Sequence, residues 1–115
     1  MEIQEEQHGG VLVVALAGRI DTTTSIDLEK RLVRHLDTGE RHLVIDLGGI
    51  EYISSAGLRV LLLVAKRVRA AGGDLVLCAL GPAVRQVFEL AGFLSIFRVE
   101  PSREQALARL ASPWP

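Results

Sequence analysis

The chain has 115 residues, a formal net charge of −1 at pH 7 and 49% hydrophobic residues. That length fits one folded domain, and the small net charge argues against a nucleic-acid-binding surface or a basic membrane-binding patch. The one cysteine, Cys78, cannot form a disulfide within the chain, which is typical of a reducing compartment. We expect its thiol to be buried, because it lies inside the apolar run 75–80.

Two features predict a cytoplasmic protein that does not contact a membrane. Residues 1–6 are acidic and polar, unlike the basic start and apolar stretch of a secretion signal. The apolar run 60–65 is far shorter than the roughly 20 residues that span a bilayer.

The first part of the chain predicts a β-hairpin. Residues 3–7 favour a short edge strand, and the apolar residues 11–17 favour a buried strand. Between them, His8-Gly9-Gly10 is typical of a turn. We expect Gly18 to end the second strand.

A helix is predicted after Asp21, because its short carboxylate can accept hydrogen bonds from the free N–H groups of a first turn. Gly39 is expected to end this helix. Residues 42–47 then favour a strand that is covered on both sides, since both of its faces are apolar. The buried stripe of the helix repeats every four residues: Leu28, Leu32 and Leu36.

Segment 48–59 carries the most suggestive chemistry. Gly48-Gly49 is expected to form a loop whose N–H groups donate to Asp46, and Ser54-Ser55 is expected to open a second helix. Gly72-Gly73 is expected to end that helix. Its apolar face follows spacings of three and four residues: Leu58, Leu61, Leu62, Ala65 and Val68.

The remainder predicts strand, helix, strand and helix in turn. Residues 75–80 favour a buried strand, and Gly81-Pro82 starts a helix, where the missing N–H of proline does no harm. A last strand is expected at 96–99. Ser102-Arg103-Glu104-Gln105 has the pattern of a capping box that opens a C-terminal helix, and residues 112–115 are expected to fray.

A hairpin followed by alternating strands and helices indicates an α/β fold. Short connections of this kind pack helices against a sheet whose consecutive strands run parallel. We therefore expect a single domain over residues 1–115, with a mixed, mostly parallel sheet.

The sequence shows no motif for catalysis, nucleotide binding or metal binding. It lacks the glycine-rich phosphate loop and the dinucleotide fingerprint, and its three histidines have no metal-ligand spacing. A Ser-His-Asp triad would need His42 and Asp46, which share one strand, to converge on Ser55. We predict no catalytic residue, no metal and no cofactor.

The serine pair has two interpretations. Serine is a preferred N-cap, worth about 1 kcal/mol over alanine, and capping explains one of the two residues. Alternatively, one hydroxyl is regulatory: a phosphate of about −1.5 to −2 charges would be tolerated by the helix dipole and by free N–H groups. Those N–H groups are expected at Ala56, Gly57 and Leu58. Gly57 also has no Cβ, so a partner could approach the backbone closely.

This segment resembles a known family. Residues 53–58 (Ile-Ser-Ser-Ala-Gly-Leu) are similar to those of STAS domains, and more narrowly of bacterial anti-sigma factor antagonists. Gly18-Arg19-Ile20-Asp21 upstream and Leu90-Ala91-Gly92 downstream support the resemblance, which covers nearly the whole chain. The best-known family pattern is Asp-Ser-Ser-Gly-Leu; here Ser54 stands at the aspartate position and Ala56 at the second serine position.

The resemblance implies a non-enzymatic regulator of sigma-factor-dependent transcription that works by partner switching. In this family the unmodified antagonist binds an anti-sigma factor that is also a serine kinase. Phosphorylation of a serine releases the antagonist, and a serine phosphatase restores it. The phosphoacceptor falls on Ser55, with Ser54 as the second choice, and Asp21 matches an aspartate that borders the partner surface.

Two residues of the second helix extend this predicted partner surface. On a helical wheel, Leu63 lies between basic side chains and away from the buried stripe. An apolar side chain in a charged face is typical of a binding surface, although a single exposed leucine is also ordinary. We predict partner contacts by these residues: Asp21, Ser54, Ala56, Gly57, Arg59 and Leu63.

A second function stays open. The chain could be a constitutive STAS scaffold subunit of a lipid-transport or stress-signalling complex, in which Ser55 is only a helix cap. Neighbouring genes for a histidine-kinase-like ATPase or a serine phosphatase would favour the switch, and transporter genes would favour the scaffold.

Overall fold

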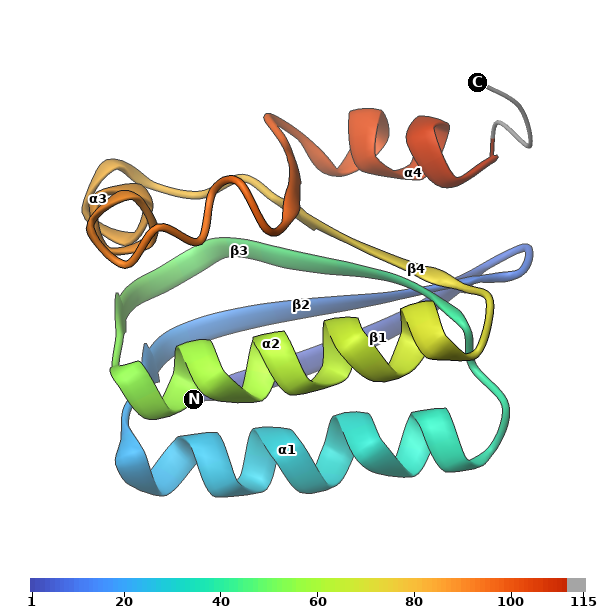
Figure 1. Ribbon diagram of the computed structural model, residues 1–115, viewed down its shortest axis with the longest axis horizontal. Coiled ribbons are helices and arrows are strands. Elements are labelled where there is room, and N and C mark those ends of the chain that lie inside the picture. The colour runs from blue at the N-terminus through green and yellow to red at the C-terminus, as the bar shows by residue number, and fades with distance from the viewer. Residues whose placement is uncertain (112–115) are drawn as a thin grey trace.

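The computed structural model describes residues 1–111, which form one sheet with helices packed against it (Figure 1). The expected frayed tail, 112–115, lies outside the described residues. The strands in the described part are β1 (Glu2–His8), β2 (Val11–Ile20), β3 (His42–Ile53), β4 (Asp74–Cys78) and β5 (Arg98–Glu100). The helices there are α1 (Thr22–Asp37), α2 (Ser55–Ala70), α3 (Pro82–Leu90) and α4 (Arg103–Ala111).

The sheet is mixed and mostly parallel, as the sequence predicts. Its strand order is β1-β2-β3-β4-β5, and only β1 runs antiparallel to its neighbour. A parallel pair needs a long crossover, which α1 supplies between β2 and β3 and α2 supplies between β3 and β4. The predicted α/β class is therefore confirmed.

Helices cover both faces of the sheet. In Figure 1, α1 and α2 lie together on one side of the strands and α4 lies on the other. The larger core contains Leu28 of α1, Leu61 of α2 and Ile45 of β3, whereas Val44 of β3 packs with Ala106 of α4. Successive residues of β3 thus point into different cores, which explains why this strand is apolar on both faces.

Two strands continue well past the ends that the sequence predicts. Strand β2 continues beyond Gly18 to Ile20, and β3 continues through Gly48-Gly49 to Ile53, where a loop was expected. The predicted glycine loop is therefore wrong. The strand pairing persists because β3 accommodates extra residues as bulges.

The first irregularity in β3 explains why glycines occur there. Ala15 pairs with Asp46, but Ala17 pairs with Gly49, so β3 has one more residue than β2 between these pairs. A Cβ on Gly49 would lie 2.8 Å from the Cβ of Ala17. The glycine therefore allows two strands to meet closely at a bulge, and does not end the strand.

The C-terminal region also differs in detail. Strand β5 begins at Arg98, two residues later than expected, because Phe97 is buried against Phe88 with ring centroids 5.8 Å apart. Helix α4 starts as predicted, with the Ser102 hydroxyl accepting from the Gln105 N–H at 3.2 Å. The Ser102 hydroxyl donates to Oε1 of Gln105 at 3.1 Å, and the Gln105 side chain does not bind the Ser102 N–H, so only half of the capping box forms.

Candidate functional site

The first turns of α1 and α2 lie side by side at one end of the sheet (Figure 1). The Ser54 N–H donates to the carbonyl of Ile20 at 2.8 Å, which ties the end of β3 to the end of β2. Asp21 follows Ile20 directly, so the bond brings Asp21 and the serine pair to the same edge. Loops and helix starts beyond the carboxyl ends of parallel strands are the usual place for function in such sheets.

Asp21 caps α1. Its Oδ1 accepts the N–H groups of Thr23 at 3.0 Å and Thr24 at 2.9 Å, and the Thr24 hydroxyl accepts the Asp21 N–H at 2.8 Å. The hydrogen bond from the Thr24 N–H to the carboxylate is the main reason that the pKa of Asp21 lies below the usual value for an aspartate. The carboxylate is thus held in one position beside the serine pair, still partly exposed.

Ser54 is the N-cap of α2. Its backbone is extended, with φ −85° and ψ 168°, and its hydroxyl oxygen accepts the Gly57 N–H at 3.2 Å. The Leu58 N–H donates to the Ser54 carbonyl at 3.0 Å. Two of the three N–H groups that we expected to be free are therefore used, and only that of Ala56 lacks a partner within residues 1–111.

Ser55 is the first residue of α2, and its environment is different. Its side chain is exposed, and its hydroxyl makes no hydrogen bond to any residue of the described chain. The structure thus separates the serine pair: the Ser54 hydroxyl caps the helix, while the Ser55 hydroxyl is open to solvent.

Gly57 corrects one interpretation of the sequence. The residue is buried, and a Cβ built on it would lie 2.6 Å from Cγ2 of Ile20 and 2.9 Å from Cγ1 of Ile53. Glycine is needed because the first turn of α2 packs directly on the ends of β2 and β3. The space without a Cβ is therefore filled by the chain's own core and is not available to a partner.

Arg59 and Leu63 lie on the exposed side of α2, where a helical wheel places them. Together with Ala56 they line a groove of about 330 Å³ between α1 and α2. The opposite wall includes Ile26 of α1, which is 53% exposed and which the sequence reasoning missed. The sequence could have predicted the exposure of Ile26, because this residue also lies away from the buried stripe of its helix.

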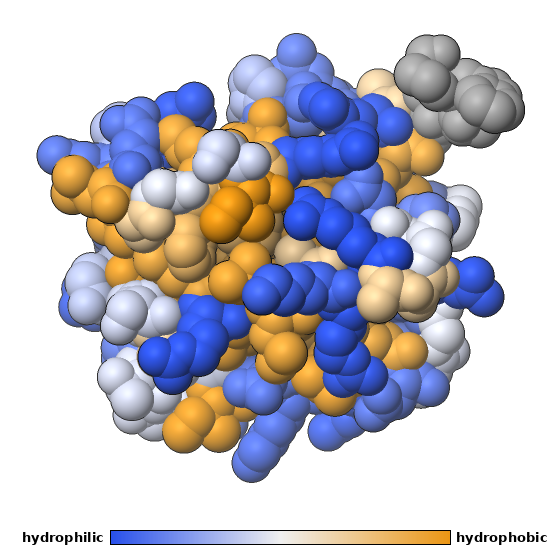
Figure 2. Space-filling model, in the orientation of Figure 1, coloured by the Kyte–Doolittle hydropathy of each residue, from blue (hydrophilic) through white to orange (hydrophobic). Residues whose placement is uncertain are grey.

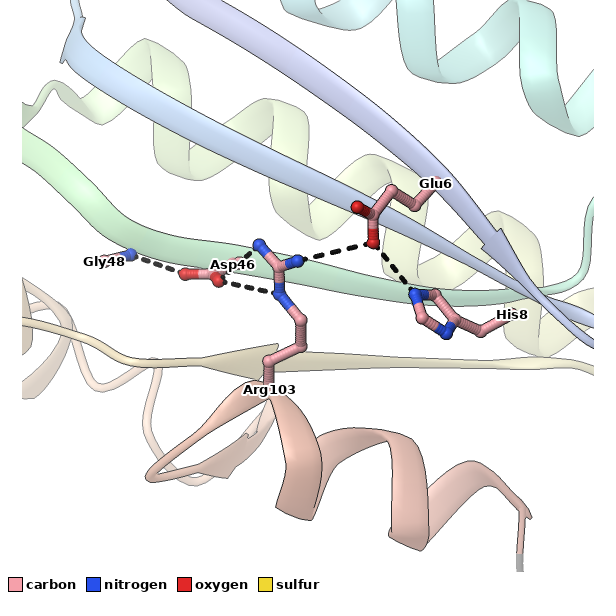
Figure 3. Close-up of polar contacts among 5 residues, drawn as sticks. All are labelled: Glu6, His8, Asp46, Gly48 and Arg103. Atoms are coloured by element: carbon pink, nitrogen blue, oxygen red, sulfur yellow. Dashed lines mark hydrogen bonds and ion pairs between the residues drawn. The ribbon is translucent and has the colours of Figure 1, made fainter.

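A second polar cluster lies on the other face of the sheet (Figure 3). Asp46 accepts the Gly48 N–H at 2.8 Å, as predicted, and also binds Arg103 of α4 through Nε at 3.1 Å and Nη2 at 3.0 Å. Arg103 Nη1 lies 3.6 Å from Glu6, which in turn contacts His8 at 2.9 Å. The Arg103 contacts anchor α4 to the sheet, and no sequence spacing could have predicted them across so many residues.

The described residues offer little for catalysis. Within 1–111 no group of three or more histidine, cysteine, aspartate or glutamate side chains could hold a metal ion. Burial raises the pKa of Cys78 to about 12, and the nearby Asp46 carboxylate adds to the shift, so the thiol stays protonated at neutral pH. No helix in the same range is long and apolar enough to cross a membrane.

Comparison with known proteins identifies the fold and the family. The STAS domain model matches residues 2–106. The chain belongs to the STAS domain family. This membership confirms the resemblance noted in the sequence, and five strands with four helices in the described part agree with a single STAS domain.

Several proteins similar to this STAS domain are anti-sigma factor antagonists by name. BtrV of Bordetella bronchiseptica, named as a candidate anti-sigma factor antagonist, is 49% identical over 115 residues, covering 100% of this chain and 99% of BtrV. The crystal structure of an antagonist from Mycobacterium paratuberculosis has a TM-score of 0.89 and 30% identity, covering 96% of this chain and 94% of that one. SpoIIAA of Bacillus in its phosphorylated form, at 19% identity, has a TM-score of 0.74 over 94% of this chain and 98% of its own, which shows the shared fold.

Proposed function

We propose that this STAS domain is an anti-sigma factor antagonist whose partner binding is switched off by phosphorylation of Ser55. The observation that carries the proposal is the difference between the two serines. The Ser55 hydroxyl is exposed and has no partner in the described chain, whereas the Ser54 hydroxyl accepts from the Gly57 N–H. The name of BtrV, with which the chain shares 49% identity, supports the class of function.

The unmodified domain binds an anti-sigma factor that is also a serine kinase, with the Ser55 loop placed near the bound nucleotide. Asp21, which the bond between Ser54 and Ile20 brings to the same edge, and Arg59, one turn after Ser55 on α2, contribute to this contact. Gly57 serves the contact only indirectly, by fixing the first turn of α2 on the sheet. Binding of the anti-sigma factor leaves the sigma factor free to direct transcription.

Phosphorylation then acts through charge. A phosphate adds about −1.5 to −2 charges at neutral pH, and the start of α2 tolerates them because the helix dipole is positive there. The domain therefore keeps its fold, while the added charge and bulk oppose contact with the kinase. A serine phosphatase removes the phosphate and restores binding. The chain itself performs no reaction in this cycle.

Incubation with the anti-sigma factor kinase and ATP, followed by mass mapping, tests the acceptor. We expect phosphate on Ser55 in the wild type and in Ser54→Ala, and none in Ser55→Ala. Ser54→Ala is the matched control, because it removes the adjacent hydroxyl and leaves Ser55 in place. Phosphate on Ser54 in the wild-type chain would contradict the assignment.

Binding to the same kinase tests the switch. Ser55→Glu should weaken binding by about a hundredfold, since it places a charge at the contact, while Ser55→Ala should bind like the wild type. Equal binding by all three forms would instead favour the constitutive scaffold, in which Ser55 is part of the helix start and nothing more.

A further inference from the structure

The groove between α1 and α2 is continuous with the serine site. At the end of the groove where both helices begin, Ala56, which follows Ser55, lines the α2 side. Thr22, which follows Asp21, lines the α1 side. From there the groove runs along the N-terminal halves of both helices. The apolar residues of its lining include Ile26, Val60 and Leu63. Each helix also contributes one charged residue, Glu29 from α1 and Arg59 from α2.

Two large apolar side chains are exposed in this groove. Ile26 is 53% exposed and Leu63 is 39% exposed, one on each helix. Nothing in residues 1–111 covers them. In Figure 2, the visible surface over α1 and α2 mixes hydrophobic patches with strongly hydrophilic side chains. Apolar groups that face each other inside a charged border are typical of a binding groove.

The charges on the α2 side have one sign. Helix α2 contains four basic residues and no acidic one. Arg67 pairs with Asp37 at 3.3 Å, and Arg69 lies 3.9 Å from Asp74. Arg59 and Lys66 have no ion-pair partner in the described part of the chain.

The two uncompensated cations flank the exposed leucine. Arg59 lies four residues before Leu63 and Lys66 lies three residues after it, so all three share one face of α2. On the opposite wall, α1 contributes Glu29 beside Ile26. The groove therefore has a positive edge along α2 and an acidic residue on the α1 side.

We infer that this groove binds an amphipathic helix of the anti-sigma partner, with an apolar stripe between Ile26 and Leu63 and an acidic edge facing Arg59 and Lys66. This rests on the proposed function and adds a second contact to it. A helix is the fitting occupant because two helices of 16 residues each leave a groove into which a third can pack its side-chain ridges. Charge complementarity sets its orientation.

The position of the groove links this contact to phosphorylation. One end of the bound helix lies beside Ala56, next to Ser55. A phosphate on Ser55 would stand close to the acidic edge of that helix, and like charges at close range repel. The same basic face that attracts the partner would be partly neutralised by the phosphate through Arg59, four residues further along α2.

Affinity for the purified kinase, measured by calorimetry with unphosphorylated variants, tests the inference. Leu63→Glu and Lys66→Glu should each weaken binding by about tenfold or more. Two matched controls should change it by less than about threefold. Leu90→Glu alters a leucine that is 82% exposed on α3, and Arg34→Glu makes the same charge reversal on α1, away from the groove.

Three results would overturn the inference, and each can be distinguished from a result that contradicts the proposed phosphorylation switch. Wild-type affinity for Leu63→Glu, together with lost affinity for Ser55→Glu, would leave the switch intact and remove the groove. Equal losses in the two controls would show a nonspecific effect of acidic charge. If sedimentation showed a dimer that Leu63→Glu dissociates, the occupant would be a second copy of this chain.

Hydrogen exchange gives a readout that does not depend on substitution. Backbone amides of α1 and α2 near Ile26 and Leu63 should exchange more slowly when the kinase is bound. Protection confined to the first turns of α1 and α2, with none along the groove, would contradict a bound helix.

Discussion

Strand β3 leads to two polar regions that differ in how their side chains are satisfied. At Asp46, every strong interaction is made inside the molecule: one carboxylate oxygen accepts the Gly48 N–H, and the other binds the Arg103 guanidinium. At the end of the same strand, Ser55 presents a hydroxyl with no partner in the described chain.

The difference separates structural from interacting polar groups. Buried or half-buried polar atoms are nearly always paired within a fold, so Asp46 and Arg103 are explained by the fold itself. An exposed hydroxyl fixed on a helix start is not needed for stability. Substitutions of Arg103 and of Ser55 should therefore have opposite profiles, with stability affected at Arg103 and partner binding at Ser55.

The largest loss of stability is expected at the glycine that joins the second region to the sheet. Gly57→Val should destabilise the fold by about 1–3 kcal/mol or more, because its side chain would overlap Ile20 and Ile53. Urea denaturation measures the loss. Gly10→Ala is the control, since nothing lies within 4 Å of its added Cβ, and it should be nearly neutral. A stable Gly57→Val variant would show that α2 can move away from the sheet.

The next largest effect is expected at the Asp46 cluster. Arg103→Ala should cost about 1–2 kcal/mol, because it removes hydrogen bonds to a charged group that is half-buried. Arg109 is on the same helix as Arg103, and Arg109→Ala, which breaks a more exposed pair with Glu100 of β5, should cost less. Denaturation should show the difference, and affinity for the kinase should be unchanged in both. A large loss of affinity in Arg103→Ala would contradict the division into two regions.

The two serines should respond differently to the same change. Ser54→Ala should cost about 1 kcal/mol, since it removes the N-cap of α2, whereas Ser55→Ala should change stability by less than about 0.5 kcal/mol. Thermal unfolding of both variants under one condition provides the measurement. A greater loss of stability in Ser55→Ala than in Ser54→Ala would show that Ser54 is not the residue that caps α2.

The smallest effect concerns the pH dependence of the Asp21 cap. The folded-state pKa of Asp21 is lowered, so its stabilising contribution is complete above the unfolded-state pKa of about 4 and is lost as pH falls through the folded-state pKa. Asn at this position caps equally well but does not titrate. The stability of the wild type relative to Asp21→Asn should therefore fall as the pH is lowered. A difference that is constant with pH would contradict the assignment.

Local patterns predicted most of the fold. The Asp21 cap, the proline at the start of α3 and the apolar spacing of α2 are encoded within a few residues, and each appears as expected. Strand ends were less predictable, because whether Gly48-Gly49 leaves the sheet depends on what β2 offers beside it. The bulges are a property of the pair of strands.

The candidate site was predictable in position but not in detail. The motif placed a serine pair at the start of α2, yet only the structure shows which hydroxyl accepts the Gly57 N–H. The role of Gly57 was misinterpreted, because its nearest neighbour, Ile20, comes from the end of a strand that is distant in sequence. Likewise, Ile26 and Leu63 line the same groove only because of the way in which α1 and α2 pack together.

The close packing at Gly57 has a consequence for how a signal could be transmitted. With Ile20 and Ile53 directly beneath it, the start of α2 has no room to tilt or sink when Ser55 is modified. The domain would then stay rigid, and phosphorylation would change the charge of the surface that a partner contacts. The conformation should be the same before and after modification. Because no conformational change is needed to return to the unmodified state, the kinase and the phosphatase would set the rate of the cycle.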